Sequence, residues 1–364
     1  MAEVGARPKV SSARRKAMRA MRTFFTPLMP DDYLEMINPL WSTEELRGRV
    51  QKLEKRTQDA VTIVIKPGAE WDRHKPGQYL RVGVIVDGVH HWRAYSLTSE
   101  PSDDFISITP KLVPEGKVSP HLTQKLQPGT IVRLGGVEGD FTLPDPPPDK
   151  LLFICAGSGI TPIMSMLRAL EQEGGIKDVV LVHSAHDRDD VIFGDWLEEL
   201  EKRSDGFRMH LQLTGEMGRI KPENLEEICP DWREREAFHS GPTEMLDMME
   251  EYWEKEGDVD KLHVERFQPK QGLGAVEEGE GGEIKFVASD VTTEADGGTP
   301  ILVAGEECGL DLDYGCREGI CHTCTGTLNS GKVRDLRNGN VYGTEGESIR
   351  VCISAPEGPV EVDL

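Results

Sequence analysis

Four cysteines near the C-terminal end of the chain restrict its fold more than any other feature. Three of them share one short loop, C-R-E-G-I-C-H-T-C, and the fourth follows after 27 intervening residues. This C-x4-C-x2-C…C spacing is the plant-type arrangement that places four thiolates around the two irons of a [2Fe–2S] cluster. Unrelated buried thiols are one alternative and zinc is the main one, but zinc sites usually combine two separate C-x2-C pairs. The spacing therefore predicts a [2Fe–2S] cluster with these ligands: Cys316, Cys321, Cys324 and Cys352.

The other three cysteines, Cys155, Cys229 and Cys308, fit no ligand spacing. We expect each to be a small buried apolar residue. The total of seven is odd and no signal peptide is visible, so a secreted disulfide scaffold is not expected. A reducing cytoplasm is the predicted compartment.

Charge is distributed unevenly along the chain. The net charge of −22 argues against nucleic acid as a partner. Residues 268–364 hold 18 acidic and 7 basic residues, whereas residues 1–30 hold seven basic residues and one acidic residue. No run of 18 apolar residues occurs, so no membrane-spanning helix is predicted.

The chain of 364 residues divides into five predicted segments. A basic extension covers 1–46, and 47–148 reads as short alternating strands with frequent turns, which predicts an antiparallel barrel. Strands and helices alternate over 149–267, which predicts an α/β domain with a parallel sheet. A glycine-rich flexible linker is expected at 268–283, before a small cluster domain at 284–364.

A first group of motifs lies in the predicted barrel. The run R-A-Y-S-L-T at 93–98 is preceded by G-Q-Y and followed by G-K-V-S at 116–119. In this order and spacing the motifs resemble the flavin-binding barrel of the ferredoxin–NADP reductase superfamily. The loop at 116–122 is similar to that of the FAD-binding subgroup, so FAD is expected rather than FMN.

The resemblance implies a role for each matching residue. Tyr95 would stack on the isoalloxazine ring, Ser96 would hydrogen-bond to the ring, and Arg93 would pair with phosphate. Gly116 and Ser119 would hold the diphosphate. The chemistry agrees, because a guanidinium fork suits phosphate oxygens and helix N-termini attract anions.

A second motif, C-A-G-S-G-I-T-P at 155–162, follows an apolar strand predicted at 151–156 and opens a helix predicted at 162–171. Gly157 and Gly159 would let the backbone approach a pyrophosphate at the helix N-terminus. Taken alone, such a turn is often merely a tight turn. In the superfamily it is the nicotinamide-nucleotide loop, and Thr161 would lie beside the nicotinamide.

Further along, Ser240-Gly241-Pro242 stands where the family has Cys-Gly-Pro, so Gly241 is expected at the nicotinamide site and Ser240 is a departure. Phe267 matches the module terminus, where an aromatic residue covers the flavin; the alternative is a core residue. A 2′-phosphate favours Ser and Arg, which Ser184 and Arg188 supply, so NADPH is predicted. Relatives often carry Arg where this chain has His186 and Gly194.

The resemblance covers roughly residues 46–364 and implies a fold of mixed α+β type with a C-terminal β-grasp ferredoxin domain. The order of flavin, nicotinamide and ferredoxin domains matches electron-transfer reductases that serve oxygenases and desaturases. Electrons would enter as a hydride and leave one at a time, so no catalytic side chain is predicted.

The extension resembles that of actinobacterial NADPH oxidoreductases that feed membrane stearoyl-CoA Δ9-desaturases, so a membrane-bound acyl-CoA desaturase is the predicted acceptor. Its apolar residues Met18, Met21, Phe25 and Leu28 recur at helical spacing among basic residues. We expect residues 1–30 to contact the membrane surface peripherally; the alternatives are a helix that packs on the barrel and a disordered tail. Two other functions remain: a reductase for a soluble ring-hydroxylating or cytochrome-type oxygenase, and a non-enzymatic iron–sulfur carrier or sensor.

Overall fold

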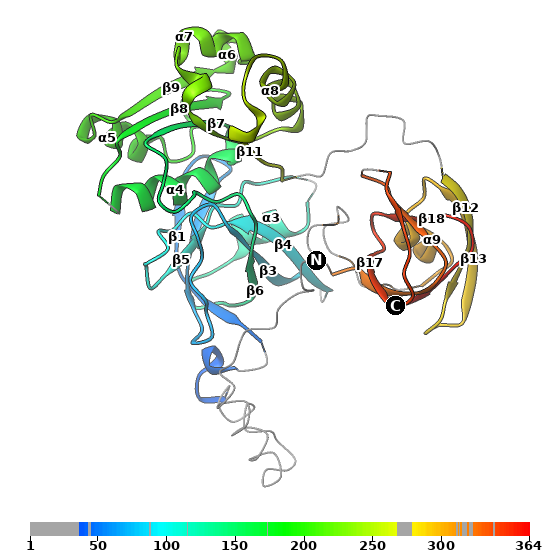
Figure 1. Cartoon of the computed structure of the whole chain (residues 1–364). Coiled ribbons are helices and arrows are strands. Elements are labelled where there is room, and N and C mark those ends of the chain that lie inside the picture. The colour runs from blue at the N-terminus through cyan, green and yellow to red at the C-terminus, as the bar shows by residue number, and fades with distance from the viewer. Residues whose placement is uncertain are drawn as a thin grey trace. The chain divides into compact units, whose positions relative to one another are not determined.

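The computed structural model describes residues 36–42, 45–86, 89–114, 116–172, 174–267, 279–310, 312, 314, 319, 323–337 and 339–364. These residues form two compact units, one built mainly from residues 6–267 and one mainly from residues 268–364 (Figure 1). Within the described ranges, no helix is long and apolar enough to cross a membrane. The apolar stripe predicted at 18–28 lies outside the described residues.

The first sheet is antiparallel and corresponds to the predicted barrel. Its strands are β1 (Arg47–Lys55), β2 (Val61–Pro67), β3 (Tyr79–Val86), β4 (Val89–Ser96), β5 (Ile106–Ile108) and β6 (Ile131–Glu138). They are ordered β4-β3-β6-β1-β2-β5, and a bridge between Leu97 and Ile108 joins the end of β4 to β5. Alternate residues point inwards, so that Val50, Ile63 and Leu80 are fully buried. The antiparallel barrel is confirmed.

Three short helices accompany this sheet: η1 (Pro39–Trp41), α3 (Val118–Pro120) and the π-helix η2 (His121–Lys125). Asn38 caps η1, because its side-chain oxygen accepts a hydrogen bond from the N–H of Leu40 at 3.2 Å. Of the last two, α3 begins inside the predicted flavin loop at 116–119 and η2 follows it.

The second sheet is parallel and corresponds to the predicted nucleotide-binding domain. Its strands are β7 (Lys150–Ala156), β8 (Asp178–Ala185), β9 (Phe207–Leu213), β10 (Glu236–Ser240) and β11 (Leu262–Glu265), in the order β11-β10-β7-β8-β9. Its helices are η3 (Gly157–Gly159), α4 (Ile160–Gln172), α5 (Gly194–Arg203), α6 (Thr214–Met217), η4 (Pro222–Asn224), α7 (Leu225–Ile228), η5 (Trp232–Glu234), α8 (Thr243–Glu256) and η6 (Val259–Lys261). The predicted strand at 151–156 and helix at 162–171 fall inside β7 and α4.

Helices cover both faces of the parallel sheet. On one face, Phe153 packs with Ile163 of α4 and Leu197 of α5. On the other face, Ile154 packs with Leu246 and Trp253 of α8. This double cover explains why β7 reads as a continuous apolar run rather than an alternating one.

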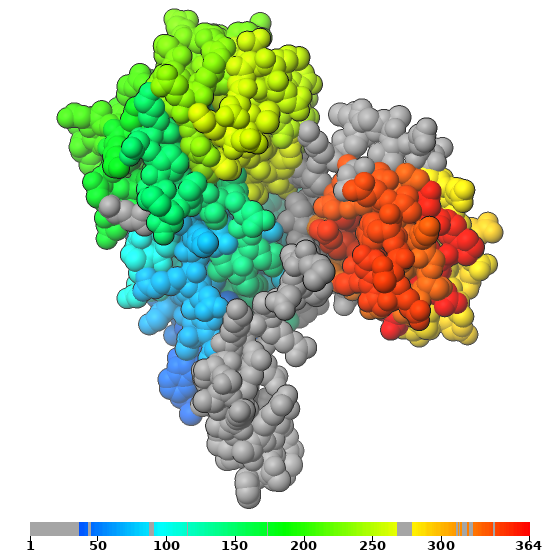
Figure 2. Space-filling view, viewed as in Figure 1, coloured from blue at the N-terminus to red at the C-terminus, as the bar shows by residue number. Residues whose placement is uncertain are grey.

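The barrel has a hydrophobic core of its own, and part of it also packs into a core of the parallel-sheet domain. Ala60 and Phe141 of the barrel belong to the same buried cluster as Ile163 and Leu167 of α4. Figure 1 shows α4 between the parallel sheet and the barrel strands, and Figure 2 shows the two parts packed against each other. Their relative position is therefore fixed by close packing.

In its described residues, the second unit contains two sheets and the helix α9. It contains β12 (Gly279–Phe286), β13 (Val291–Gly297), α9 (Ile301–Glu307), β14 (Thr325–Ser330), β15 (Val333–Asp335), β16 (Val341–Tyr342), β17 (Glu347–Arg350), β18 (Ser354–Pro356) and β19 (Val360–Asp363). The main sheet runs β13-β12-β19-β14-β17, with β12 and β19 parallel, and a small sheet runs β16-β15-β18. Ile301 and Leu302 of α9 pack onto Phe286 in one core, as in a β-grasp domain.

The last five residues of the predicted linker at 268–283 belong to a strand. Residues 268–278 lie outside the described residues, but β12 already begins at Gly279, which pairs with Gly297. The prediction extended the linker to 283 because glycines are typical of flexible segments. Here they serve close packing instead: Gly281 has φ +65° at a bulge, and a Cβ on Gly282 would lie 2.3 Å from the carbonyl oxygen of Gly358.

Candidate cofactor sites

The nucleotide turn connects β7 to α4 at the carboxyl edge of the parallel sheet. Gly157 has φ +53°, and a Cβ on Gly159 would lie only 2.0 Å from the carbonyl oxygen of Ser240. Only glycine fits at 159, because the turn after β7 touches the backbone at the end of β10. Thr161 is buried, and its hydroxyl donates to the Ser158 carbonyl at 2.9 Å. The start of α4 thus presents backbone N–H groups, which is the arrangement that suits an anion.

Ser240 ends β10 beside this turn. Its side chain is fully buried, and among the described residues its hydroxyl oxygen has no hydrogen-bond partner. Gly241 follows closely against β7, since a Cβ there would lie 3.2 Å from the Ala156 nitrogen. Buried hydroxyls are normally hydrogen-bonded, so an unpaired one beside a nucleotide turn suits a polar group of a bound ligand, such as the carboxamide of nicotinamide.

A pocket of about 250 Å³ opens beside the turn. Its lining includes Gly157, Ser184, Arg219, Pro242 and Met245. Ser184, at the end of β8, is thus a wall residue of this pocket. The pocket has room for part of a nucleotide, with both a hydroxyl and a guanidinium in its wall.

Arg188 does not line this pocket. It lines a separate hollow and pairs with Glu198 at 3.4 Å. The carboxylate of Asp187 accepts hydrogen bonds from the N–H groups of Asp189 and Asp190, at 2.9 and 3.1 Å, and so curls the loop after β8. The structure thus does not bring together Ser184 and Arg188, which the sequence had paired.

Sequence reasoning missed Arg219, which follows α6 and the left-handed Gly218. It pairs with Glu244 at 2.6 Å, and both side chains are largely exposed. The available signal was topological: in a parallel sheet, the segments after successive strands meet at one edge, and Arg219 follows β9 as Ser184 ends β8.

The predicted flavin residues lie on and beside β4. Tyr95 is half-buried and packs against the barrel core, Ser96 is buried, and Arg93 donates to the Trp92 carbonyl at 2.9 Å. Arg93 and Tyr95 share one face of the strand and Ser96 lies on the other, because side chains alternate. An aromatic face and a guanidinium on one side fit a flavin ring and its phosphate.

The 116–119 loop is a tight turn closed by Ser119. Its hydroxyl oxygen accepts from the Val113 N–H at 3.0 Å and lies 3.3 Å from the Val113 carbonyl. The Gly116 N–H donates to the same carbonyl at 2.9 Å, and a Cβ on Gly116 would lie 3.2 Å from the Ser119 hydroxyl. Ser119 thus shapes the loop, and glycine at 116 lets the Ser119 hydroxyl lie close to the backbone.

A carboxylate at the end of β11 was also missed. Glu265 pairs in register with Ser240, and burial, with Asp140 adding to it, raises its pKa to about 7. Burial and nearby Glu138 and Glu265 also raise the pKa of Tyr79 well above its ordinary value. Glu265 can therefore hold a proton near neutral pH next to the nicotinamide-side residues. Phe267, two residues on, is half-buried.

Two of the four predicted cluster ligands are described. Cys324 is 2% exposed and Cys352 is 5% exposed, whereas Cys316 and Cys321 lie outside the described residues. Cys324 directly precedes β14 and Cys352 follows β17, and these strands pair with Thr325 opposite Arg350. The N–H of Val351 donates to the Cys324 carbonyl at 3.1 Å. The two thiols therefore lie at the same end of neighbouring strands, which fits a shared cluster.

The cluster loop is held at Gly319, which has φ +72° and faces Ile353. Arg350 donates to the Gly319 carbonyl at 2.5 Å. Of the remaining cysteines, Cys155 and Cys229 are buried as predicted, but Cys308 is exposed. That prediction was wrong because Cys308 lies just past α9, where its thiol donates to the Gly305 carbonyl at 3.1 Å.

Comparison with known proteins agrees with this arrangement. Three family models match: an oxidoreductase FAD-binding domain at 52–143, an oxidoreductase NAD-binding domain at 153–251 and a 2Fe-2S iron-sulfur cluster binding domain at 285–357. The protein is thus a flavin-dependent NAD(P)H oxidoreductase with its own [2Fe–2S] domain. A non-enzymatic carrier or sensor is therefore not supported.

Individual relatives and one solved structure show which proteins share this combination of domains. A Mycobacterium tuberculosis protein named NADPH oxidoreductase is 42% identical over 98% of this chain and 96% of its own length. A glycine betaine monooxygenase reductase subunit of Pseudomonas aeruginosa is 32% identical over 79% of this chain and 87% of its own. The chain belongs to the ferredoxin–NADP reductase superfamily, in the branch with a C-terminal [2Fe–2S] domain. The fold of phthalate dioxygenase reductase matches with a TM-score of 0.58, at 20% identity, over 87% of this chain and 97% of that chain.

Proposed function

We propose that this reductase takes electrons from NADPH and delivers them, through FAD and the [2Fe–2S] cluster, to a membrane-bound acyl-CoA desaturase. The observation that carries the proposal is the match to the mycobacterial NADPH oxidoreductase, which extends over 98% of the chain. The match to the glycine betaine monooxygenase reductase subunit extends over only 79% of the chain. The proposal that the acceptor is a desaturase rests on the N-terminal extension, which resembles that of reductases that supply electrons to such enzymes.

The preference for NADPH is supported by the pocket beside the nucleotide turn. Ser184 and Arg219 both line it, and a guanidinium with a hydroxyl is suited to a 2′-phosphate. Replacing Arg219 by alanine should raise the KM for NADPH about 10- to 100-fold, the equivalent of a charge-assisted hydrogen bond, and leave NADH little affected. Equal loss with both nucleotides would contradict this role for Arg219.

The cluster domain supports charge-steered delivery. Residues 268–364 carry 18 acidic and 7 basic residues, so a partner with a basic patch would be attracted over about a Debye length. The rate of electron transfer to the acceptor should therefore fall as ionic strength rises. A rate independent of salt would remove the electrostatic part of the proposal.

Reconstitution tests the acceptor directly. Purified reductase, NADPH and membranes that contain a stearoyl-CoA desaturase should form the unsaturated product, and Cys352→Ser reductase should not. We also propose that residues 1–30 contact the membrane surface, so their deletion should lower vesicle binding and desaturation together. Equal binding and equal desaturation by the truncated protein would show that the extension is not a membrane contact.

A second acceptor class is favoured by the names of other relatives. Two reductase components of monooxygenases, the glycine betaine subunit and a 3-ketosteroid-9-alpha-monooxygenase component of Mycolicibacterium smegmatis, are 32% and 30% identical. If a soluble oxygenase is the true acceptor, the full-length and truncated proteins should reduce it equally fast. The desaturase should then remain inactive with either protein.

A further inference from the structure

Two side chains of α4 hold the backbone that follows the predicted flavin strand β4. The hydroxyl of Ser165 donates to the carbonyl of Ser99 at 2.9 Å, and Nε2 of His74 contacts the same carbonyl at 3.2 Å. One turn further along α4, the guanidinium of Arg168 donates to the carbonyl of Thr98. Ser165 is fully buried, so its bond to Ser99 forms in a protected interior where it is worth more than in water.

Arg168 is fixed on its other sides by aromatic rings. Its guanidinium carbon lies 5.5 Å from the centre of the Phe193 ring and 5.7 Å from that of Trp196. Phe193 itself stands in the left-handed region, with φ +63°, directly before α5. A planar cation between two rings has little freedom to move, and lysine cannot reproduce this arrangement.

The same helix connects both cofactor sites. Its N-terminus is the nucleotide turn, and Thr161 lies one helical turn before Ser165. At the other end of the contact, Thr98 lies two residues after Ser96, the predicted flavin ligand. Met166 adds a third contact, because a Cβ on Gly77 would lie 2.5 Å from its methyl carbon. Any shift of α4 therefore moves the nucleotide turn relative to β4.

We propose that Ser165 and Arg168 are a positioning pair that sets the separation between the nicotinamide at the nucleotide turn and the flavin beside β4. Hydride transfer needs reacting atoms about 3–3.5 Å apart, and a misplacement of about 1 Å costs on the order of 100-fold in rate. Neither residue needs to touch a reacting atom. The proposal rests on the flavin lying beside β4, within the matched FAD-binding domain at 52–143.

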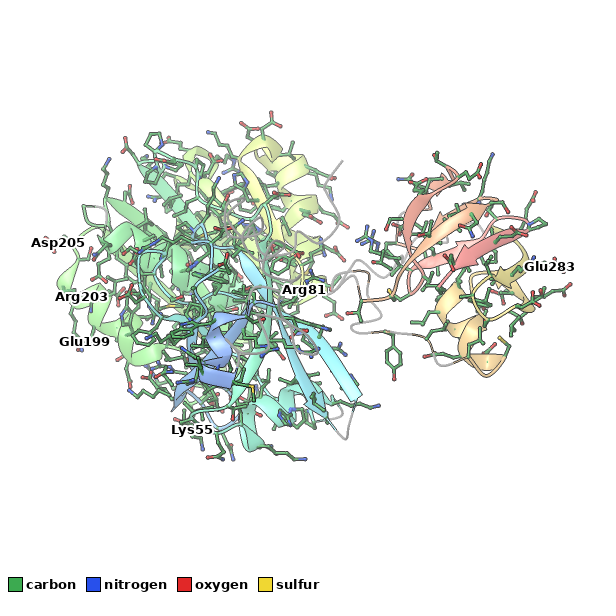
Figure 3. All side chains as sticks on the ribbon, turned by 90° about the horizontal axis from the view of Figure 1, so that it is seen from below. Lys55, Arg81, Glu199, Arg203, Asp205 and Glu283 are labelled. Atoms are coloured by element: carbon green, nitrogen blue, oxygen red, sulfur yellow. The ribbon has the colours of Figure 1, made fainter. Side chains whose placement is uncertain are left out.

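The test compares two variants with a matched control. Arg168→Met keeps an apolar stem but loses the bond to Thr98, and Ser165→Ala loses only a hydroxyl. The control is Arg203→Met: Arg203 (Figure 3) lies over the same Trp196 ring at 5.3 Å and pairs with Glu171 of α4, so it contacts no barrel residue through these bonds. Each protein is purified with FAD bound, and FAD content, NADP⁺ affinity and Tm are measured first.

Flavin reduction by saturating NADPH is then followed by stopped flow. We expect about a 10- to 100-fold slower step in Arg168→Met, a smaller loss in Ser165→Ala and none in Arg203→Met. The long-wavelength charge-transfer absorbance between nicotinamide and flavin should weaken in the same order, while FAD content and NADP⁺ affinity stay unchanged. Arg168→Lys should recover only part of the rate.

Two results would overturn the proposal. In the first, both variants reduce the flavin as fast as the control and keep the charge-transfer absorbance. In the second, rate, FAD content, NADP⁺ affinity and Tm all fall together, which would make the pair merely structural. If FAD content alone is lost, the assumed place of the flavin beside β4 is wrong.

Discussion

The nucleotide turn and the cluster loop both depend on glycines, but they are held in different ways. Around Gly159 the neighbours are main-chain atoms of a parallel sheet, with the Ser240 carbonyl 2.0 Å from where a Cβ would stand. Around Gly319 the nearest neighbour is the side chain of Ile353, and the loop carbonyl is held by Arg350. One loop is fixed by the fold itself and the other by a few side chains.

The difference indicates how each site should fail. Main-chain neighbours inside a closely packed sheet cannot yield, so a change at the nucleotide turn must disturb the domain. Side-chain neighbours can adjust, so a change at the cluster loop should alter the cluster while the rest of the chain remains folded.

The largest expected effect is at the cluster. Cys352→Ser should abolish the absorbance of the cluster and lower the rate of acceptor reduction at least about 100-fold, because a thiolate ligand is lost. Flavin reduction by NADPH should continue, because the first unit has its own core. The two rates are measured by stopped flow, and a normal cluster in the variant would contradict the ligand assignment.

A smaller but broader effect is expected at the nucleotide turn. Gly159→Ala should destabilise the protein by about 1–3 kcal/mol, because the added methyl overlaps the Ser240 carbonyl, and should weaken NADPH binding as well. Urea unfolding and NADP⁺ titration measure both. Gly194→Ala is the control, since its nearest neighbour is a Val191 side-chain carbon at 3.3 Å. If the two variants were equally stable, the claim that main-chain contacts fix the nucleotide turn would be wrong.

At the cluster loop, Arg350→Met should leave the fold intact and lower the reduction potential of the cluster. The variant removes both a cation and the donor to Gly319. A charge-assisted hydrogen bond of about 1.5 kcal/mol corresponds to roughly 60 mV for a one-electron couple. Redox titration by electron paramagnetic resonance measures it. An unchanged potential would show that Arg350 only supports the loop.

Glu265 gives a pH dependence that belongs to the first unit. Because burial raises its pKa from 4.5 to about 7, the folded state binds the proton more tightly than the unfolded chain. Its contribution to stability is thus fully present below about pH 4.5 and is lost as pH rises through about 7. Urea unfolding should show this loss in the native protein and not in Glu265→Gln. If stability changed with pH equally in both proteins, a group other than Glu265 would cause the pH dependence.

The smallest effect is expected from Arg188. Its pairing with Glu198 is exposed, and it does not line the nucleotide pocket, so Arg188→Ala should change stability by less than about 1 kcal/mol and hardly alter the KM for NADPH. Steady-state kinetics of Arg188→Ala and Arg219→Ala, measured side by side, compares their KM values for NADPH. If Arg188→Ala raised the KM for NADPH more than Arg219→Ala does, Arg188 would be the residue that binds the 2′-phosphate, as the sequence predicted.

Much of the architecture follows from local patterns. Alternating short strands predicted the barrel, and the apolar run before Gly157 predicted a strand of the parallel sheet. Cysteine spacing alone predicted the cluster, and Cys324 and Cys352 lie at the same end of neighbouring strands, as a shared cluster requires. Such features are readable because each is set by a few neighbouring residues.

Other features depend on contacts that sequence spacing does not encode. Arg219 reaches the pocket through sheet topology, and Arg188 leaves it because Asp187 curls the loop. The raised pKa of Glu265 comes first from burial and then from the charge of Asp140, a residue far away in the sequence. The contacts from α4 to Thr98 and Ser99 likewise join residues about 70 positions apart.

The central claim is that one chain converts a hydride into single electrons through a flavin and a cluster. An anaerobic reductive titration of the purified native protein and of Cys352→Ser, followed by absorbance and electron paramagnetic resonance, tests it most directly. We predict uptake of about three electrons per native chain, two by the flavin and one by the cluster, and about two in the variant with no cluster signal. Equal uptake by both proteins, with the same cluster signal, would contradict the account.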